Sequence, residues 1–488
     1  MREANVKKIN EAPQQGIGMD VIIVSTGNIK QETFWQERLQ QMQGYLTKPG
    51  AILVAVEEDW PGGAGNALGT FYAYNKARDK VRALHGVDIA DMQKEGAAIA
   101  IYHTAGQGMR LFPLTASECG NKPAVKLPGL VGPVEAAKLI TMLEAVIKQT
   151  AIYAPSRMGR LSVFWGDQIF IPSTGCDYTP RGHIDILTKR CLLPDAKQWK
   201  EQGLGNYGLI TVDGKKEALY LEKVTCEAFA QLCQEGKIFP EKDIGISMGS
   251  FSLSTAMTFA LLDLFEPELL QHTLKMDVEP FIWMASTLDL NTYIQQMDLR
   301  GYPKEKSQSH HARLQAFKHA FCKQHPELTF FDVVDIGADS CWWDFGNIGA
   351  YYTNLMKLTG ADAEAQLMHS FFNTKSCLLN CDVKEGSIKN SVVVNVKADY
   401  MDVSDCVIIN SSFHKVKADR CLFYNVSEEE DLAPEPRTIR ADAPLPVDKE
   451  HLKLYTHLDR DGKADWNIRL PTNALSYAEL HKLYNNPF

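Results

Sequence analysis

The sequence has no apolar run that approaches the roughly 20 residues needed for a membrane-spanning helix. Residues 1–16 are polar and lack the apolar core of a signal peptide. The 11 cysteines are scattered without metal-ligand spacing, which is typical of free thiols in a reducing compartment. The formal net charge of −9 contains no long run of either sign, which disfavours a nucleic-acid partner. These absences predict a cytoplasmic protein without a membrane or nucleic-acid partner.

The size of the chain and its apolar pattern predict a layered α/β protein. Its 488 residues, 45% of them hydrophobic, suffice for a large core and two or three domains. Apolar runs that end in glycine-rich or acidic turns predict strands over residues 21–24, 51–56, 97–102 and 161–165. Helical spacing predicts one helix through Trp35 and Met42, and another that starts near Pro133 and buries Leu139 and Ile147. Together they predict a mostly parallel, Rossmann-like sheet covered on both faces, with ligands beyond the carboxyl ends of its strands.

The C-terminal part has a different pattern. Short β-branched runs start at residues 390, 405 and 420, a 15-residue period, with a looser copy at 376. A fixed period of this kind predicts a parallel β-helix after the first domain, and the alternative is a small β-sandwich, which would need hairpin turns. We assign residues 1–360 to the first domain, 361–426 to the β-helix, and 427–488 to an acidic, proline-rich linker and a C-terminal segment. Because β-helix coils expose an apolar end, we expect the C-terminal region to mediate homo-oligomer contacts more than chemistry.

The strongest local signal follows the third predicted strand. Residues 104–115 read TAGQGMRLFPLT, and residues 121–124 read NKPA. Glycines after a buried strand let the backbone N–H groups approach phosphates, and Arg110 and Lys122 would add positive charge as the candidate catalytic residues. The candidate nucleotide-binding residues of this loop are Ala105, Gly106, Gln107 and Gly108. A lone Gly-x-Gly is often only a turn, but here the Arg-Leu-x-Pro-Leu and Lys-Pro elements follow together.

These elements resemble the signature of the sugar nucleotidyltransferase (NDP-sugar pyrophosphorylase) family, which runs roughly GGxGxRLxPLT and then KP. The match departs at Ala105, where the family usually has glycine, and at Met109, where it often has threonine. The resemblance implies a Mg²⁺-dependent enzyme that binds a nucleoside triphosphate and a sugar 1-phosphate. Its products would be an NDP-sugar and pyrophosphate.

The same resemblance implies the metal and sugar sites. The segments FWGD (residues 164–167) and WWDFGN (342–347) are similar to the two family motifs that hold Mg²⁺, which makes Asp167 and Asp344 the expected ligands. Two carboxylates leave other positions of the ion to phosphate oxygens and water. The segments YGLITVD (207–213) and LEK (221–223) resemble the sugar-binding segment, with Glu222 on sugar hydroxyls and Lys223 on the sugar phosphate. Val224 stands where the family has proline.

A second glycine-rich segment, residues 62–70, precedes the signature. Most family members place their base-binding glycine loop after the Lys-Pro element, where the helix expected from Pro133 leaves no room. The displaced order is similar to the fucose-1-phosphate guanylyltransferase (GDP-fucose pyrophosphorylase) group, patchily over residues 20–426. The expected contacts to the base or ribose are Gly65, Asn66, Gly69 and Thr70, unless the segment is an ordinary surface turn.

Other functions stay open at this point. The same reaction could use another base and sugar, giving a UDP-, ADP- or CDP-sugar. An inactive nucleotide-sugar-binding regulator or scaffold is the alternative from another class. Acyl transfer through the repeats is disfavoured, because His414 is their only histidine.

Overall fold

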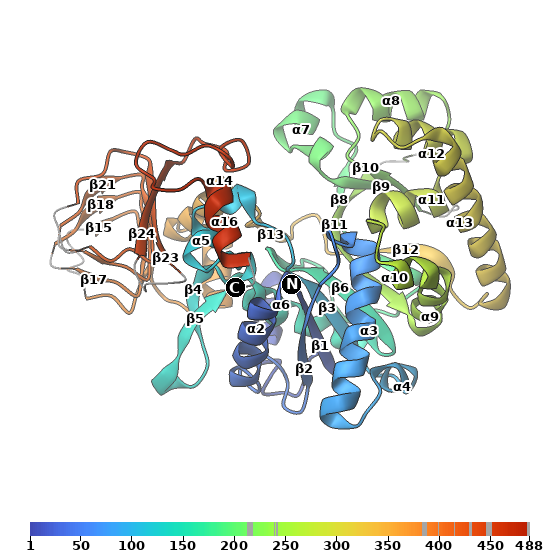
Figure 1. Ribbon diagram of the computed structural model, residues 1–488, viewed down its shortest axis with the longest axis horizontal. Coiled ribbons are helices and arrows are strands. Elements are labelled where there is room, and N and C mark those ends of the chain that lie inside the picture. The colour runs from blue at the N-terminus through green and yellow to red at the C-terminus, as the bar shows by residue number, and fades with distance from the viewer. Residues whose placement is uncertain are drawn as a thin grey trace.

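The computed structural model describes residues 1–488 except 212–217, 239, 241–242, 383–387, 399, 414, 429–431, 446–450 and 486–488. Asp213 and His414 therefore lie outside the described residues. The protein is mixed α/β, and its central sheet lies between a helical lobe and a stack of short C-terminal strands (Figure 1). Within the described residues, no helix combines the length and apolar character that crossing a membrane requires.

The core of the central sheet is parallel. Its strands run in the order β2, β1, β3, β6, and each neighbouring pair is parallel. Their bounds are β1 (Val21–Thr26), β2 (Ile52–Glu57), β3 (Ile99–His103) and β6 (Arg160–Trp165). These are the strands that the apolar runs predict, with ends that differ by at most two residues. The prediction of an α/β chain with a largely parallel central sheet is confirmed.

Beyond β6 the sheet becomes mixed. β11 pairs antiparallel with β6, β8 and β9, β10 pairs antiparallel with β9, and β12 pairs parallel with β8. The bounds are β8 (Gly182–Leu192), β9 (Gly208–Thr211), β10 (Leu219–Glu222), β11 (Asp243–Ser254) and β12 (Thr329–Asp335). The helices of this lobe, on the right of Figure 1, are α7 (Ala196–Glu201), α8 (Cys226–Gln234), α9 (Thr255–Leu264), α10 (Glu266–Gln271), α11 (Ala285–Thr287), α12 (Leu290–Asp298) and α13 (Lys304–Gln324).

Side chains of the parallel strands alternate between two cores, which explains why these strands read as unbroken apolar runs. Ile22 and Val24 pack in the core that contains residues of α2 (Ile29–Gln41) and α6 (Met142–Thr150). Val21 and Ile23 pack in the opposite core, with residues of α3 (Gly65–His85) and α9. The N-terminal helix α1 (Arg2–Glu11) adds to the first core and α4 (Ile89–Lys94) to the second.

A β-hairpin occupies the place where apolar spacing predicts the start of a helix. β4 (Lys126–Val131) pairs antiparallel with β5 (Lys138–Thr141), where Leu139 lies opposite Leu130. The helix α6 begins only at Met142. The Glu144 N–H donates to Thr141 Oγ1 at 3.3 Å, and the Thr141 N–H donates to the Glu144 carboxylate at 2.8 Å, so this reciprocal cap fixes the start. The predicted start near Pro133 is wrong, because the apolar residue Leu139 belongs to a strand.

Short strands after residue 377 stack in parallel with a constant offset. Val392 pairs with Val407 and Val407 with Leu422, so segments 15 residues apart in sequence lie side by side. The 15-residue period of the sequence therefore equals the offset between residues that pair in neighbouring strands. The stacked strands are β14 (Leu378–Leu379), β16 (Val392–Val394), β19 (Val407–Ile409) and β22 (Leu422–Tyr424); β15 (Ile388–Lys389), β18 (Asp402–Ser404) and β21 (Lys417–Asp419); and β17 (Lys397–Ala398) with β20 (Ser412–Phe413). The helices α14 (Ile348–Met356) and α15 (Ala363–Phe372) lie between these stacks and the sheet domain in the chain.

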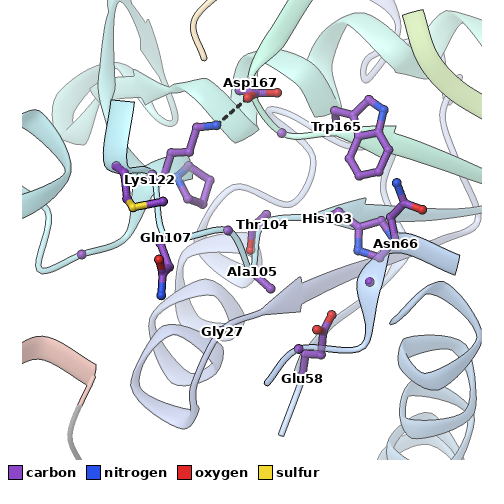
Figure 2. Close-up of a pocket in the computed structure, with 18 of the residues that line it drawn as sticks. Gly27, Glu58, Asn66, His103, Thr104, Ala105, Gln107, Lys122, Trp165 and Asp167 are labelled. Atoms are coloured by element: carbon purple, nitrogen blue, oxygen red, sulfur yellow. Dashed lines mark hydrogen bonds and ion pairs between the residues drawn. The ribbon is translucent and has the colours of Figure 1, made fainter. Parts of the chain in front are cut away.

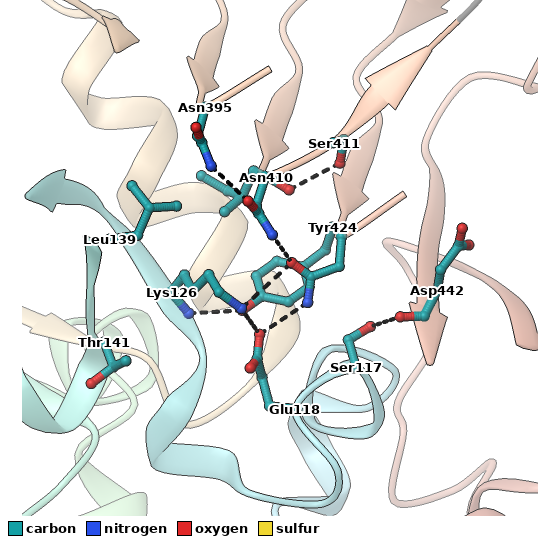
Figure 3. Close-up of polar contacts among 12 residues, drawn as sticks. Ser117, Glu118, Lys126, Leu139, Thr141, Asn395, Asn410, Ser411, Tyr424 and Asp442 are labelled. Atoms are coloured by element: carbon teal, nitrogen blue, oxygen red, sulfur yellow. Dashed lines mark hydrogen bonds and ion pairs between the residues drawn. The ribbon is translucent and has the colours of Figure 1, made fainter. Parts of the chain in front are cut away.

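An asparagine directly follows each of the strands β16, β19 and β22 in the stack that they form. Asn395, Asn410 and Asn425 have φ values of 55°, 51° and 53°, a left-handed conformation that asparagine tolerates better than most residues. The Asn395 amide donates to Asn410 at 2.6 Å, and the Asn410 amide donates to Asn425 at 2.8 Å (Figure 3). This row of asparagine hydrogen bonds continues to Glu118, outside the stack, because the Asn425 amide donates to the Glu118 carboxylate at 3.0 Å. Glu118 directly follows α5 (Leu114–Ser117) and also forms an ion pair with Lys126 at the start of β4, so the stack is joined to both elements.

The stretch predicted as an acidic linker contains ordered structure. β23 (Thr438–Pro444) pairs parallel with β22 and antiparallel with β24 (His451–His457). Arg440 is fully buried and pairs with Asp442 at 2.9 Å and Glu428 at 2.7 Å. The acidic residues thus face a buried arginine, which composition alone does not reveal. The last helix, α16 (Tyr477–Asn485), lies beside α5 (Figure 1).

The buried ion pair at the start of α6 gives a stability prediction. The Arg38 guanidinium lies 2.6 Å from the Glu144 carboxylate, and the two side chains are 10% and 0% exposed. Glu144→Gln should lower the free energy of unfolding by about 3–5 kcal/mol, because it leaves a buried charge without its partner. The control is Glu11→Gln, which breaks the exposed Lys7–Glu11 pair of 3.9 Å and should cost less than about 1 kcal/mol. Equal losses in denaturant unfolding would contradict the prediction.

Candidate functional site

A large cavity opens at the carboxyl ends of the parallel strands. Its volume is about 1010 Å³, and it lies where β1, β3 and β6 pass into loops (Figure 2). The sequence-predicted residues that line it are Gly65, Asn66, Ala105, Gly106, Gln107, Gly108, Arg110, Lys122 and Asp167. The structure therefore brings the glycine loop, both candidate catalytic cations and one candidate metal ligand into one cavity.

The glycine loop is restrained at both ends, by hydrogen bonds at its start and by backbone conformation and close packing at its end. At its start, the Thr104 N–H and Thr104 hydroxyl donate to the Ser25 carbonyl at 3.0 and 2.6 Å, which ties the loop to the neighbouring strand. At its end, Gly108 has a left-handed φ of 66°. A β-carbon at Gly108 would lie 2.9 Å from Thr115 Cγ2 and 3.0 Å from Lys122 Cβ. Glycine is needed here for both conformation and space.

A separate two-stranded sheet brings the candidate metal ligands together. β7 (Gln168–Ile171) begins directly after Asp167, and β13 (Cys341–Asp344) ends at Asp344. The strands pair antiparallel with Asp344 opposite Gln168, and the Phe345 N–H donates to the Asp167 carbonyl at 2.9 Å. Residues that are far apart in sequence therefore meet at the edge of the cavity.

Four predicted charged residues converge beside Gly346. Lys122 Nζ lies 2.5 Å from Asp167 Oδ2, and these side chains are 18% and 22% exposed (Figure 2). A β-carbon at Gly346 would lie 2.9 Å from Asp344 Oδ1, 3.5 Å from Asp167 Oδ2 and 3.6 Å from Arg110 Nη2. The small residue leaves space between two carboxylates and two cations, where a polar ligand would meet both signs of charge.

The environment of Asp344 fits a bound cation. Burial, and then the negative charge of Asp167, raise the pKa of Asp344, while the Gly346 N–H, Lys122 and Arg110 oppose the rise. A divalent cation between two such carboxylates would offset this repulsion. Within the part of the chain that the structure describes, no group of three or more His, Cys, Asp or Glu side chains could hold a metal. An ion bound here would take its other ligands from a substrate or water.

The second glycine-rich segment is a helix start more than a loop. α3 begins at Gly65, so Gly69 and Thr70 lie inside the helix and outside the cavity lining. Thr70 Oγ1 lies 2.7 Å from His103 Nε2, and a β-carbon at Gly69 would lie 2.8 Å from Glu58 Oε2. These two positions therefore support the cavity wall from behind.

The Asn66 side chain is half-buried and is held by hydrogen bonds to residues 278 and 279. Its amide N–H₂ donates to Glu279 at 3.0 Å, its amide oxygen accepts from the Val278 N–H at 2.6 Å, and its backbone N–H donates to Asp277 at 2.9 Å. The expected use of this side chain to read a base conflicts with these bonds, because a base would have to displace them. Asn66 instead joins the cavity wall to residues 277–279.

Glu222 and Lys223 lie outside the cavity lining but close to residues that contact it. The two side chains pair at 2.9 Å, with Glu222 10% and Lys223 61% exposed. Burial, and then the negative charge of Glu222, raise the pKa of Glu279, which is the partner of Asn66. The Lys223 N–H donates to the Tyr207 carbonyl at 3.2 Å, and burial and then Asp344 raise the pKa of Tyr207. The Tyr207 ring also lies 5.0 Å from the Trp342 ring, so this segment approaches the candidate metal ligand Asp344 through Tyr207.

Several cavity residues were not predicted as site residues. His103 and Trp165 are the last residues of β3 and β6, and their rings lie 5.5 Å apart. The rule that ligands bind at strand ends would have identified both. The other unpredicted titratable residues of the lining are Glu58, Lys275, Asp277, Lys463 and His481, which no motif marks.

The glycine loop gives a matched pair of predictions. Gly108→Ala should lower the free energy of unfolding by about 1–2 kcal/mol from the left-handed conformation alone, and more from the contacts with Thr115 and Lys122. Gly106→Ala adds the same methyl group where nothing lies within 4 Å, so its effect should stay within about 0.5 kcal/mol. Thermal unfolding of both variants tests this, and equal melting temperatures would contradict it.

Glu279 gives a prediction about pH. Burial, and then Glu222, raise its pKa from 4.5 to about 7. As pH rises from 4.5 to 7, the unfolded chain releases a proton that the folded protein keeps, so this group lowers stability progressively through that window. Glu279→Gln still accepts from Asn66 but does not titrate, so it should melt higher than wild type above pH 7, with a gain that shrinks toward pH 4.5. A pH-independent difference in melting temperature would argue against this role.

Comparisons with known proteins add no assignment to this geometry. No protein-family model matches the sequence, and no curated protein matches it significantly. Conclusions about function therefore depend on the residues of the site.

Proposed function

We propose that this protein is a Mg²⁺-dependent sugar-1-phosphate nucleotidyltransferase. It would transfer a nucleoside monophosphate from a triphosphate to a sugar 1-phosphate and release pyrophosphate. The observation that carries the proposal is the group of Arg110, Lys122, Asp167 and Asp344 around Gly346, at the end of the glycine loop. Two cations and two carboxylates suit a ligand that is polyanionic and binds a divalent cation.

This reaction needs positioning more than covalent chemistry from the protein. An oxygen of the sugar phosphate attacks the α-phosphorus in line, and the bond to pyrophosphate breaks. The phosphate nucleophile needs no general base, so the protein holds two anions together and offsets their repulsion. Arg110 and Lys122 neutralise charge that develops on the leaving pyrophosphate. Bound by Asp167 and Asp344, Mg²⁺ would supply further positive charge to the phosphates.

The remaining cavity features fit the other parts of a nucleotide. Backbone N–H groups of Ala105, Gly106, Gln107 and Gly108 would contact phosphates. The rings of His103 and Trp165, with centroids 5.5 Å apart and planes inclined by 32°, would offer aromatic contacts to a base or sugar. Gly65 and Asn66 would form the wall beside it. GTP is the triphosphate that the fucose-type resemblance favours, and UTP, ATP or CTP would use the same phosphate contacts.

The sugar and the C-terminal region complete the proposal. As the family resemblance implies, Glu222 would contact sugar hydroxyls and Lys223 the sugar phosphate. The Lys223–Tyr207 hydrogen bond and the Tyr207–Trp342 ring contact support this, because they bring the segment toward Asp344. We also propose that the three parallel stacks are faces of one β-helix, which their common 15-residue offset supports. Residues 1–360 would then be the catalytic domain and 361–426 the β-helix.

The test is pyrophosphate release. The full-length protein is incubated with each of four nucleoside triphosphates and a panel of sugar 1-phosphates, including fucose 1-phosphate, with Mg²⁺ or with EDTA. We expect release only with both substrates and Mg²⁺, and an NDP-sugar product by mass spectrometry. Nucleotide-sugar binding without turnover on the whole panel would favour the inactive scaffold.

Variants of the charged group test the assigned roles. Asp167→Asn and Asp344→Asn should each lower turnover by orders of magnitude, and the double variant should be little worse than either, because both would serve one ion. Arg110→Ala and Lys122→Ala should also lose orders of magnitude in kcat, each through a lost charge interaction with the leaving group.

Asp177→Asn is the control for the carboxylate variants. Asp177 is 72% exposed and pairs with Lys8 at 3.1 Å, away from the cavity lining. It should keep wild-type turnover. Near-normal rates in Asp167→Asn or Asp344→Asn with Mg²⁺ would refute the metal assignment.

A further inference from the structure

Two residues of the cavity lining come from the far end of the chain. Lys463 and His481 lie in the C-terminal segment, after the repeats. This is the segment whose sequence predicts subunit contacts more than chemistry. The packing of this segment explains why two of its residues reach the cavity.

The C-terminal segment lies directly against the glycine loop. A β-carbon at Gly462 would lie 2.4 Å from the Met109 carbonyl oxygen and 3.5 Å from the Phe112 carbonyl oxygen, so the two backbones are in contact. The Phe112 ring lies 5.0 Å from the Trp466 ring and 5.1 Å from the Tyr477 ring. Phe112 belongs to an apolar cluster with Leu454, Leu470 and Leu480. The C-terminal segment of the same chain thus covers one side of residues 109–112, which directly follow the glycine loop.

The turn that carries Lys463 is held in shape. Arg460 makes two hydrogen bonds to the Asp465 carboxylate, at 2.5 and 2.7 Å, and the Asp465 side chain is 7% exposed. The Lys463 N–H donates to Asp461 Oδ1 at 2.9 Å. Lys463 itself is exposed and lines the cavity. A fixed backbone therefore presents a long, adaptable cation beside residues 108–110.

We propose that the C-terminal segment forms one wall of the substrate site and that Lys463 binds phosphate groups there, at the pyrophosphate end of the nucleotide. This inference rests on the proposed function. Its basis is the contact of Gly462 with Met109, because that contact places Lys463 next to the loop that ends in Arg110. Lys122 is already paired with Asp167, so a triphosphate gains from another cation on this side. Lysine binds phosphate as a mobile point charge, which suits an exposed wall.

The test measures binding of inorganic pyrophosphate, in Mg²⁺, to the full-length protein by calorimetry. Lys463→Ala should weaken binding roughly tenfold, the order of magnitude of a lost charged hydrogen bond. Lys463→Arg keeps the charge and should retain most of the affinity. Lys482→Ala removes an exposed lysine from α16, in the same segment but outside the cavity lining, and should bind like wild type. Melting temperatures of all variants should match, because Lys463 is exposed.

The outcomes separate the two proposals. If wild type binds pyrophosphate and Lys463→Ala binds as tightly as Lys482→Ala, the inference is wrong and the proposed function is unaffected. If affinity falls equally in Lys463→Ala, Lys463→Arg and Lys482→Ala, the phosphate role of Lys463 is also wrong. If wild type binds neither pyrophosphate nor any nucleoside triphosphate, the proposed function fails and the inference fails with it.

Discussion

The site depends on the register of three parallel strands. β1, β3 and β6 pair so that Ser25 lies opposite His103, and His103 opposite Trp165. β3 and β6 end at this level and β1 ends one residue later, so the backbone groups that follow need new hydrogen-bond partners. Thr104 supplies such partners, because its N–H and its hydroxyl both donate to the Ser25 carbonyl. The glycine loop and Asp167 follow directly, so the position of the cavity is a consequence of the sheet.

Charge sets the second constraint. Burial, and then the negative charge of Asp167, raise the pKa of Asp344, and Lys122 and Arg110 only partly oppose this rise. A polyanion alone would be repelled by the carboxylates, and a cation alone by Lys122 and Arg110. A ligand that brings both signs, such as a phosphate with a bound divalent cation, satisfies the whole group. The composition of this group argues for a metal–phosphate complex more strongly than any one of its residues does.

The sequence predicts what depends on local pattern. Buried parallel strands require apolar residues on both faces, so the runs at Val21 and Ile99 are visible without a structure. The 15-residue repeat is visible for the same reason, and asparagines at 395, 410 and 425 could have marked the ends of its strands. The prediction of a helix from Pro133 was wrong because Leu139 fits the pattern of a strand as well as that of a helix. The role of Asn66 was hidden because its partner Glu279 lies 213 residues further along the chain.

The C-terminal wall could not be predicted from pattern, and its physical basis differs from that of the sheet edge. Contacts of Gly462 with the Met109 carbonyl, and of Trp466 with Phe112, depend on the shape of a surface that exists only once the sheet has formed. The apolar cluster around Phe112 holds the signature loop from one side, while the β1–β3 contact holds it from the other. A loop built around glycines is conformationally free by itself. It can present its N–H groups in one arrangement because segments from both ends of the chain restrain it.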